Sequence, residues 1–93
     1  MTYRIELHPA ILEELIKARQ WYEDRSEGLG NRFIAAVEQR LEQIKRNPEQ
    51  YAKKKRKYRE VSIPIFPYKI IYEVLKKEKI VFISYIIHSK RKS

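Results

Sequence analysis

The side chains best suited to chemistry lie near the end of the chain. His88 has Tyr85 three residues before it and Arg91 three residues after it. Cleavage of a phosphodiester without a metal needs a proton acceptor, a proton donor and a cation near phosphorus, and these residue types can supply all three. Ordinary structure explains the pattern too: a histidine at a strand end is more often a cap, and Tyr85 in so apolar a strand is expected in the core.

A second candidate is a run of cations just before the most strand-like part of the chain. The run consists of Lys53, Lys54, Lys55, Arg56, Lys57 and Arg59. Such a run can follow a sugar-phosphate backbone or attract an acidic protein, and it is equally typical of a solvated loop. Three more cations, at positions 90–92, follow the last apolar segment, and a shared sheet edge would bring the two clusters together.

The charge of the chain is distributed very unevenly. Residues 1–52 contain 8 Lys and Arg against 9 Asp and Glu, whereas residues 53–93 contain 13 against 3, and the whole chain has a net charge of +9. One end of the molecule can therefore present a positive field to a polyanion or to an acidic protein while the other end stays close to neutral.

Length and composition limit the remaining possibilities. We expect a single domain over residues 1–93, because this length supports one core. The chain has no cysteine, and its two histidines lack metal-ligand spacing, so neither a metal nor a cofactor is expected. The longest apolar run, residues 80–87, has the length of a strand and is too short to span a membrane. A cytoplasmic location is the resulting expectation.

Periodicity predicts the elements of the first half. Apolar residues alternate with charged ones over residues 3–7, as in a half-buried strand. Pro9 suits the first turn of a helix, and the amphipathic pattern that follows ends near Ser26 and Gly28. A second amphipathic helix begins around residues 29–31 and is ended by Asn47-Pro48. The short gap predicts an antiparallel helical hairpin whose joint apolar surface must be covered by a sheet.

Three strands are expected in the second half: one around residues 61–65, one over 68–75 and one over 80–87. Pro64 and Pro67 indicate that the strand around residues 61–65 lies at a sheet edge, contains a bulge or ends early. The last is apolar at almost every position, so we expect it to be central and covered on both faces. The order predicts an α+β fold, a small β-α-α-β-β-β domain whose mostly antiparallel sheet is covered on one face by the helical hairpin. We expect the first strand to run either antiparallel to the second strand or parallel to the last strand.

Short segments along nearly the whole chain resemble the RelE/ParE superfamily of toxins from bacterial type II toxin-antitoxin (plasmid stabilisation) systems. They are Trp21-Tyr22-Glu23, Gly28-Leu29-Gly30 with Phe33, Asn47-Pro48-Glu49-Gln50-Tyr51, Arg59, Phe66-Pro67-Tyr68-Lys69-Ile70-Ile71-Tyr72 and His88-Ser89-Lys90-Arg91. The resemblance implies the same β-α-α-β-β-β fold and a growth-inhibiting toxin that is neutralised by a small protein antitoxin with an acidic or amphipathic tail.

The resemblance allows two mechanisms. RelE-like members cut messenger RNA on the ribosome, whereas ParE-like members are not nucleases and poison DNA gyrase. The Phe-Pro-Tyr at 66–68 and the short ending on His88 and Arg91 look more like the ParE side. A RelE-like nuclease carries alternating cations along the second strand, where this chain has Val61 and Ile63. We therefore predict a ParE-like toxin that inhibits growth through DNA gyrase.

Site residues follow from this prediction. We expect Arg59, His88 and Arg91 to be functional, with Lys53 to Lys57 and Lys90 attracting antitoxin carboxylates or the target. In the alternative, a metal-independent and ribosome-dependent endoribonuclease, Arg59 and Arg91 stabilise the scissile phosphate. His88 or Tyr85 then handles protons. A third possibility is a non-toxic basic module that binds nucleic acid with strong salt dependence.

Overall fold

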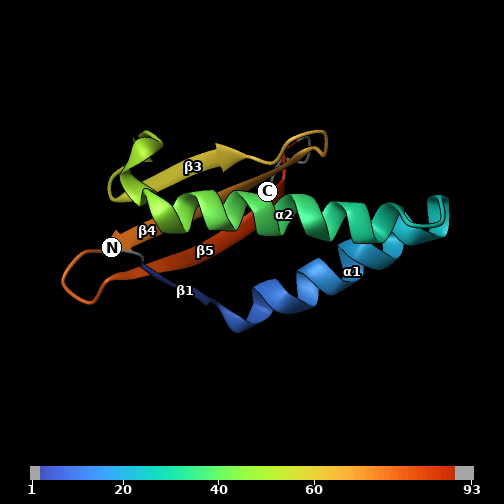
Figure 1. Cartoon of the computed structure of the whole chain (residues 1–93), viewed down its shortest axis with the longest axis horizontal. Helices are drawn as coiled ribbons and strands as arrows, with labels where there is room; N and C mark the ends of the chain where they lie inside the picture. Colours follow the sequence, from blue (N-terminus) through green and yellow to red (C-terminus); the bar gives the residue numbers. More distant parts are fainter. Residues whose placement is uncertain (1–2, 90–93) are drawn as a thin grey trace.

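The computed structural model describes residues 3–89, which form two helices packed against a five-stranded sheet (Figure 1). The elements are β1 (Arg4–Leu7), α1 (Pro9–Arg25), α2 (Leu29–Arg46), a short 3-10 helix η1 (Pro48–Gln50), β2 (Lys53–Lys55), β3 (Tyr58–Ser62), β4 (Tyr68–Leu75) and β5 (Ile80–His88). The predicted α+β fold and its β-α-α-β-β-β order are confirmed, and β2 is an additional strand within the predicted basic run.

The sheet has the strand order β1-β5-β4-β3-β2. β1 runs parallel to β5, and every other neighbouring pair is antiparallel. The second of the two predicted placements of the first strand is therefore the observed one. β2 was missed because three consecutive lysines show no apolar alternation. Its position at the sheet edge explains the composition, since lysines on an edge strand discourage pairing with other chains.

The turn between the helices is closed by one carboxylate and two glycines. Glu23 accepts hydrogen bonds from the backbone N–H groups of Gly28 and Gly30, both at 2.9 Å, and these bonds lower the pKa of its carboxyl group. Gly28 has a φ of 85°, which favours glycine. A Cβ on Gly30 would lie 2.5 Å from the carbonyl oxygen of Arg19, so the helices can approach this closely only with a glycine at this position.

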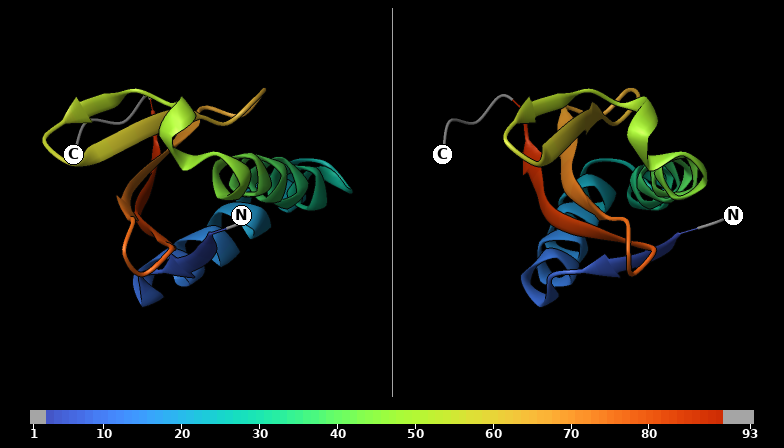
Figure 2. Two further views of the ribbon diagram at one scale, coloured as in Figure 1. Left: turned by 60° about the vertical axis from the view of Figure 1, so that its left-hand side comes forward. Right: turned by 90° about the vertical axis from the view of Figure 1, so that its left-hand side faces the viewer.

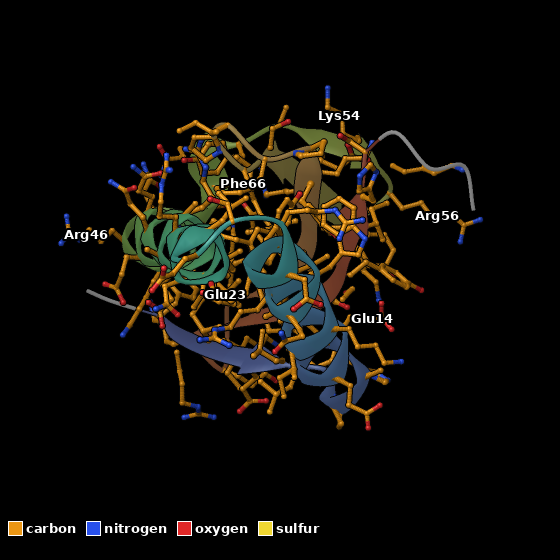
Figure 3. The ribbon with its side chains drawn as sticks, turned by 90° about the vertical axis from the view of Figure 1, so that its right-hand side faces the viewer. Glu14, Glu23, Arg46, Lys54, Arg56 and Phe66 are labelled. Carbon is orange, nitrogen blue, oxygen red and sulfur yellow. The ribbon has the colours of Figure 1, made fainter. Side chains whose placement is uncertain are left out.

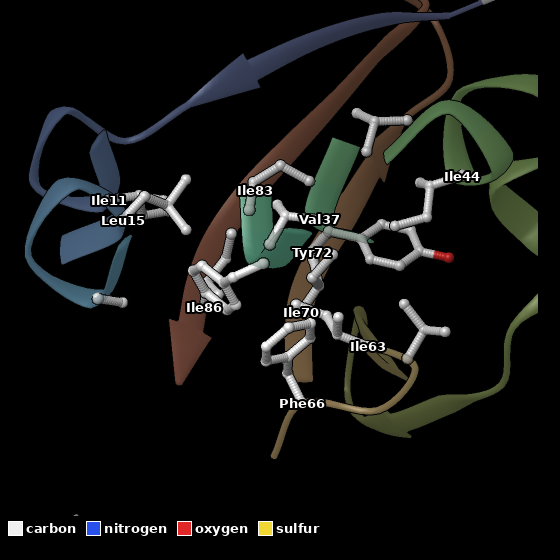
Figure 4. Packing of buried hydrophobic residues seen from close by; sticks show 14 of the residues in the cluster. Ile11, Leu15, Val37, Ile44, Ile63, Phe66, Ile70, Tyr72, Ile83 and Ile86 are labelled. Atoms are coloured by element: carbon white, nitrogen blue, oxygen red, sulfur yellow. The ribbon is translucent and has the colours of Figure 1, made fainter. Parts of the chain in front are cut away.

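The core lies between the sheet and the two helices (Figures 2 and 4). The predicted apolar stripe of α1 is buried, and so are the inward-facing residues of β4 and β5. Tyr72 is completely buried, its hydroxyl donates a 2.6 Å hydrogen bond to the Pro48 carbonyl oxygen, and burial raises its pKa to about 12. Tyr22 of α1 packs against Tyr68 of β4, with ring centroids 6.4 Å apart.

Two expectations for β5 are wrong. The strand is internal to the sheet but is covered on one face only, because both helices pack on the same side. Its side chains therefore alternate between buried positions such as Ile83 and half-exposed ones such as Phe82. Tyr85, expected in the core, is 56% exposed on the uncovered face, because a register shift in the pairing of β4 with β5 between Ile71 and Tyr72 interrupts the alternation after Ile83. The predicted early stop near Pro64 is observed, since β3 ends at Ser62.

Candidate functional site

The basic run forms a hairpin at one edge of the sheet. We call residues 53–59, which comprise β2 and the start of β3, the basic hairpin. Lys53 lies opposite Arg59 and Lys55 opposite Tyr58 in the antiparallel register. Arg56 occupies the turn with a φ of 53°. The strand pairing fixes the backbone of the hairpin, so its side chains project from a defined edge.

Most cations of the basic hairpin are exposed. Within residues 3–89, no salt bridge involves Lys54, Lys55 or Arg56. Figure 3 shows Lys54 and Arg56 pointing outward from the body of the molecule. Lys57 lies 3.4 Å from a carboxylate oxygen of Glu73 on β4. The hairpin thus presents cationic groups that are available to a partner.

Arg59 differs from its neighbours because it points to the inner face of the sheet. Its side chain is only 12% exposed, and Nη1 donates a 2.7 Å hydrogen bond to the Tyr51 carbonyl oxygen. Its Nη2 lies 3.7 Å from the Glu49 carboxylate, which is also 2.8 Å from Lys76 Nζ. The hydrogen bond from Lys76, more than the charge of Arg59, lowers the pKa of Glu49. Arg59 therefore holds the segment after α2 against β3.

His88 and Tyr85 lie on opposite faces of β5. His88 pairs with Tyr68 at the start of β4, and their rings contact edge to face with centroids 5.1 Å apart. Tyr85 pairs with Ile71 and faces solvent. This arrangement gives His88 a packed position under the α1 side and leaves the Tyr85 hydroxyl on the outer surface.

The predicted site residues are not gathered at one point. Arg59 lies opposite Tyr72 and His88 opposite Tyr68, on the two flanks of β4. Four residues along a strand correspond to about 13 Å, to which the width across β4 must be added. The expected meeting of the basic hairpin with the cations at positions 90–92 stays a prediction. Lys90 and Arg91 lie outside the described residues.

The two histidines do not form an acid-base pair either. His8 is the N-cap of α1, where its Nδ1 accepts a 3.1 Å hydrogen bond from the Ala10 N–H, and its own N–H donates to the Ile83 carbonyl oxygen at 3.3 Å. His88 is five residues further along β5, or about 16 Å. Within residues 3–89, no group of three or more His, Asp or Glu residues is placed to hold a metal ion.

A groove of about 780 Å³ lies between α1 and the second half of β5, and none of the sequence-based predictions includes it. His8 and His88 lie along it together with Trp21, Tyr58 and Tyr85. Trp21 is 49% exposed, and the Arg25 guanidinium stacks 3.5 Å from the centroid of its ring. One signal was available: Trp21 is a large apolar residue that lies off the buried stripe of α1.

No helix in the described part of the chain has both the length and the apolar character needed to cross a membrane. The outward face of α2 carries charged and polar side chains, as expected for a helix with one face on a core and the other in water, whereas α1 also exposes Leu12, Ile16 and Trp21.

Comparison with known proteins gives one family and one fold. A family model described as "ParE toxin of type II toxin-antitoxin system, parDE" matches residues 5–93. The isolated E. coli RelE toxin has a similar structure, with a TM-score of 0.66 and 15% identity over 97% of this chain and 87% of that chain. The toxin of the intact E. coli RelBE complex matches with a TM-score of 0.66 and 15% identity, over 96% and 99% of the two chains.

An archaeal RelE–RelB complex from Pyrococcus horikoshii matches with a TM-score of 0.57 and 18% identity, over 99% of this chain and 100% of that chain. At these identities the likeness shows a shared fold. None of the curated proteins matches the sequence significantly.

Proposed function

The chain belongs to the ParE toxin family of type II toxin-antitoxin systems, within the RelE/ParE superfamily, and from this premise we propose that it arrests growth by binding DNA gyrase through its basic hairpin. The observation that carries the proposal is the set of exposed cations at Lys54, Lys55 and Arg56, which no carboxylate within residues 3–89 neutralises. A net charge of +9 adds long-range attraction to an acidic surface.

The composition of β3 favours binding over cleavage. Arg59 and Val61 on β3, and Ile63 directly after it, are turned toward the core, the last two being 9% and 3% exposed. On the outer side the same strand offers Glu60 and Ser62, which carry no positive charge. A row of cations that could hold a scissile phosphate is therefore missing from β3. The Arg59 guanidinium is already engaged by Tyr51 and Glu49.

A protein antitoxin is the second partner that we propose. Two solved structures with a similar fold are complexes of RelE with RelB, which supports a partner of the same kind here. The charge of the chain favours an antitoxin segment with acidic residues, since opposite charges accelerate association and orient the encounter.

Ribosome-dependent cleavage of messenger RNA is the alternative, and one observation favours it. Tyr85 is 56% exposed and lines the same groove as His88, although the two side chains leave β5 on opposite faces, so the Tyr85 hydroxyl is accessible from solvent for proton transfer. Both mechanisms occur within the superfamily whose fold this chain shares. The fold therefore does not separate them, and the target must be found by experiment.

Induced expression in bacteria, with and without the adjoining small open reading frame, tests the toxin function. We expect growth arrest that the adjoining frame relieves. Purified protein should then inhibit supercoiling by gyrase and leave ribosome-bound messages intact. Replacing Lys54, Lys55 and Arg56 together by Glu should abolish this inhibition. The matched change Arg32→Glu, at an exposed position in the first turn of α2 and at the opposite end of the molecule, should have little effect (Figure 1). Cleaved messages with unimpaired gyrase would establish the alternative.

A further inference from the structure

The uncovered face of the sheet carries three aromatic rings, opposite the face on which the helices pack (Figure 2). Tyr58 begins β3, Phe82 lies between two buried residues of β5, and Tyr85 is 56% exposed. All three rings line one groove together with Glu73, so they are neighbours. Aromatic rings on an open sheet face form a platform on which the bases of a single-stranded nucleic acid can stack. The uncovered face therefore offers the first of two features that such a ligand needs.

The second feature is positive charge beside the rings, and two carboxylates remove it. On the described strands β3, β4 and β5, the Asp, Glu, Lys and Arg side chains directed to this face are Glu60, Lys69 and Glu73. Lys69 Nζ lies 3.5 Å from a carboxylate oxygen of Glu60. Lys57 Nζ, from the turn before β3, lies 3.4 Å from a carboxylate oxygen of Glu73. The charges of these four side chains cancel, so neither lysine is available to a phosphate group.

The two carboxylates are less exposed than the lysines that they pair with. The side chains of Glu73 and Glu60 are 16% and 28% exposed, whereas those of Lys57 and Lys69 are 63% and 34% exposed. A nucleic-acid backbone that crossed the rings would therefore meet carboxylate oxygens held close to the sheet, and like charges repel. Repulsive groups of this kind give specificity, because they exclude a ligand whose other contacts are favourable.

The basic hairpin has the opposite arrangement. Lys54, Lys55 and Arg56 form no salt bridge within residues 3–89. They belong to β2 and its turn, whereas the three rings belong to β3 and β5. The net charge of +9 attracts RNA as well as acidic proteins, so long-range attraction alone does not select between them. The pairing of the cations beside the rings does select.

We propose that Glu60 and Glu73 are specificity-determining residues. By pairing with Lys69 and Lys57 they keep single-stranded RNA off the aromatic face, and the basic hairpin remains open to protein partners. The proposal rests on the proposed function, because it takes a protein and not RNA as the target. It implies that the chain has a latent RNA-binding face, which two substitutions open.

Replacing both carboxylates by neutral amides tests the proposal. The double variant Glu60→Gln with Glu73→Gln should bind a short single-stranded RNA of mixed sequence about tenfold or more tightly than the wild type, because both lysines become free to contact phosphates. The slope of log affinity against log salt concentration should also steepen, by about 1.4 for two added phosphate contacts. Fluorescence anisotropy of labelled RNA at several salt concentrations measures both changes.

A charge-matched control separates the local effect from the change in net charge. Glu27→Gln with Glu38→Gln alters the net charge equally on the helical side of the sheet, at exposed residues without a salt bridge in the described chain. RNA binding by this control should stay within about twofold of the wild type. An equal gain in the control, or no gain in the Glu60 and Glu73 variant, overturns the proposal.

One more variant tests whether the gained RNA lies on the rings. Adding Tyr85→Ala to the Glu60 and Glu73 variant should weaken RNA binding by about fivefold or more, because a base loses its stacking partner. Unchanged binding overturns the proposal. If urea denaturation shows that the double variant is poorly folded, Glu60→Gln alone should give half the increase in slope, and no increase again overturns the proposal. Inhibition of gyrase by the wild type is measured separately, so a failed specificity role and a failed gyrase target give different results.

Discussion

Two parts of the basic hairpin have the same composition and opposite surroundings. Lys54, Lys55 and Arg56 extend into solvent, with no salt bridge to the described residues. Arg59, which pairs with Lys53 across the hairpin, is 12% exposed and bound to the Tyr51 carbonyl oxygen and the Glu49 carboxylate. The role of a cation in such a run therefore depends on the strand face that it occupies. The exposed cations can bind a partner, whereas Arg59 stabilises the fold.

The largest effect on stability is expected at Arg59. Arg59→Met leaves the Tyr51 carbonyl oxygen without its donor and Glu49 with one cation fewer, and should lower the free energy of unfolding by about 3 kcal/mol. Urea denaturation measures this change. Arg56→Met is the matched control and should change it by less than about 0.5 kcal/mol. If Arg59→Met is fully stable yet no longer arrests growth, Arg59 belongs to the functional surface and the comparison fails.

A smaller loss of stability is expected when Tyr72 is changed. Tyr72, like Arg59, holds the segment that follows α2 against the sheet. Tyr72→Phe removes the hydroxyl that donates to the buried Pro48 carbonyl oxygen at 2.6 Å. The loss should cost about 1–2 kcal/mol, because a buried acceptor is left without its donor. Thermal unfolding of the variant measures it. Tyr85→Phe serves as control, since its exposed hydroxyl can bond to water, and an equal loss in both variants would contradict the anchoring role.

Acid should weaken the contacts that Glu49 makes with Lys76 and Arg59. The pKa of Glu49 in the folded chain lies below its ordinary value of 4.5, mainly because of the hydrogen bond from Lys76. Its ionised form therefore stabilises the folded chain above pH 4.5, and this contribution is lost as the pH falls through the lowered pKa. The stability difference between wild type and Glu49→Gln should shrink between pH 5 and about pH 3. A difference that stays constant over this range argues against the Glu49–Lys76 contact.

The smallest effect on stability is expected from the exposed cations. Replacing Lys54, Lys55 and Arg56 together by Gln should change the free energy of unfolding by less than about 0.5 kcal/mol, because no contact within the described chain depends on their charges. Binding to gyrase and to the antitoxin should nevertheless weaken and lose much of its salt dependence. Titrations at two salt concentrations measure this change. Unaltered binding would place the partner surface elsewhere.

Most of the secondary structure follows from the order of apolar and polar residues along the chain. The buried stripe of α1, the ends of both helices and the three apolar strands were all predictable, because the period of the apolar residues records which face of each element is covered. The family was recognisable for a similar reason, since short segments at fixed spacing run along nearly the whole chain.

Which side chains lie side by side on one surface depends on tertiary contacts. The direction in which Arg59 points depends on its pairing with β4. Tyr85 is exposed because the pairing of β4 with β5 shifts register between Ile71 and Tyr72, which places Ile83 and Tyr85 on opposite faces of the sheet. The groove exists because β1 stops opposite Ile83 while β5 continues to His88. These features arise from contacts between segments that are far apart in the chain. Local periodicity carries no information about such contacts, because it describes each element separately.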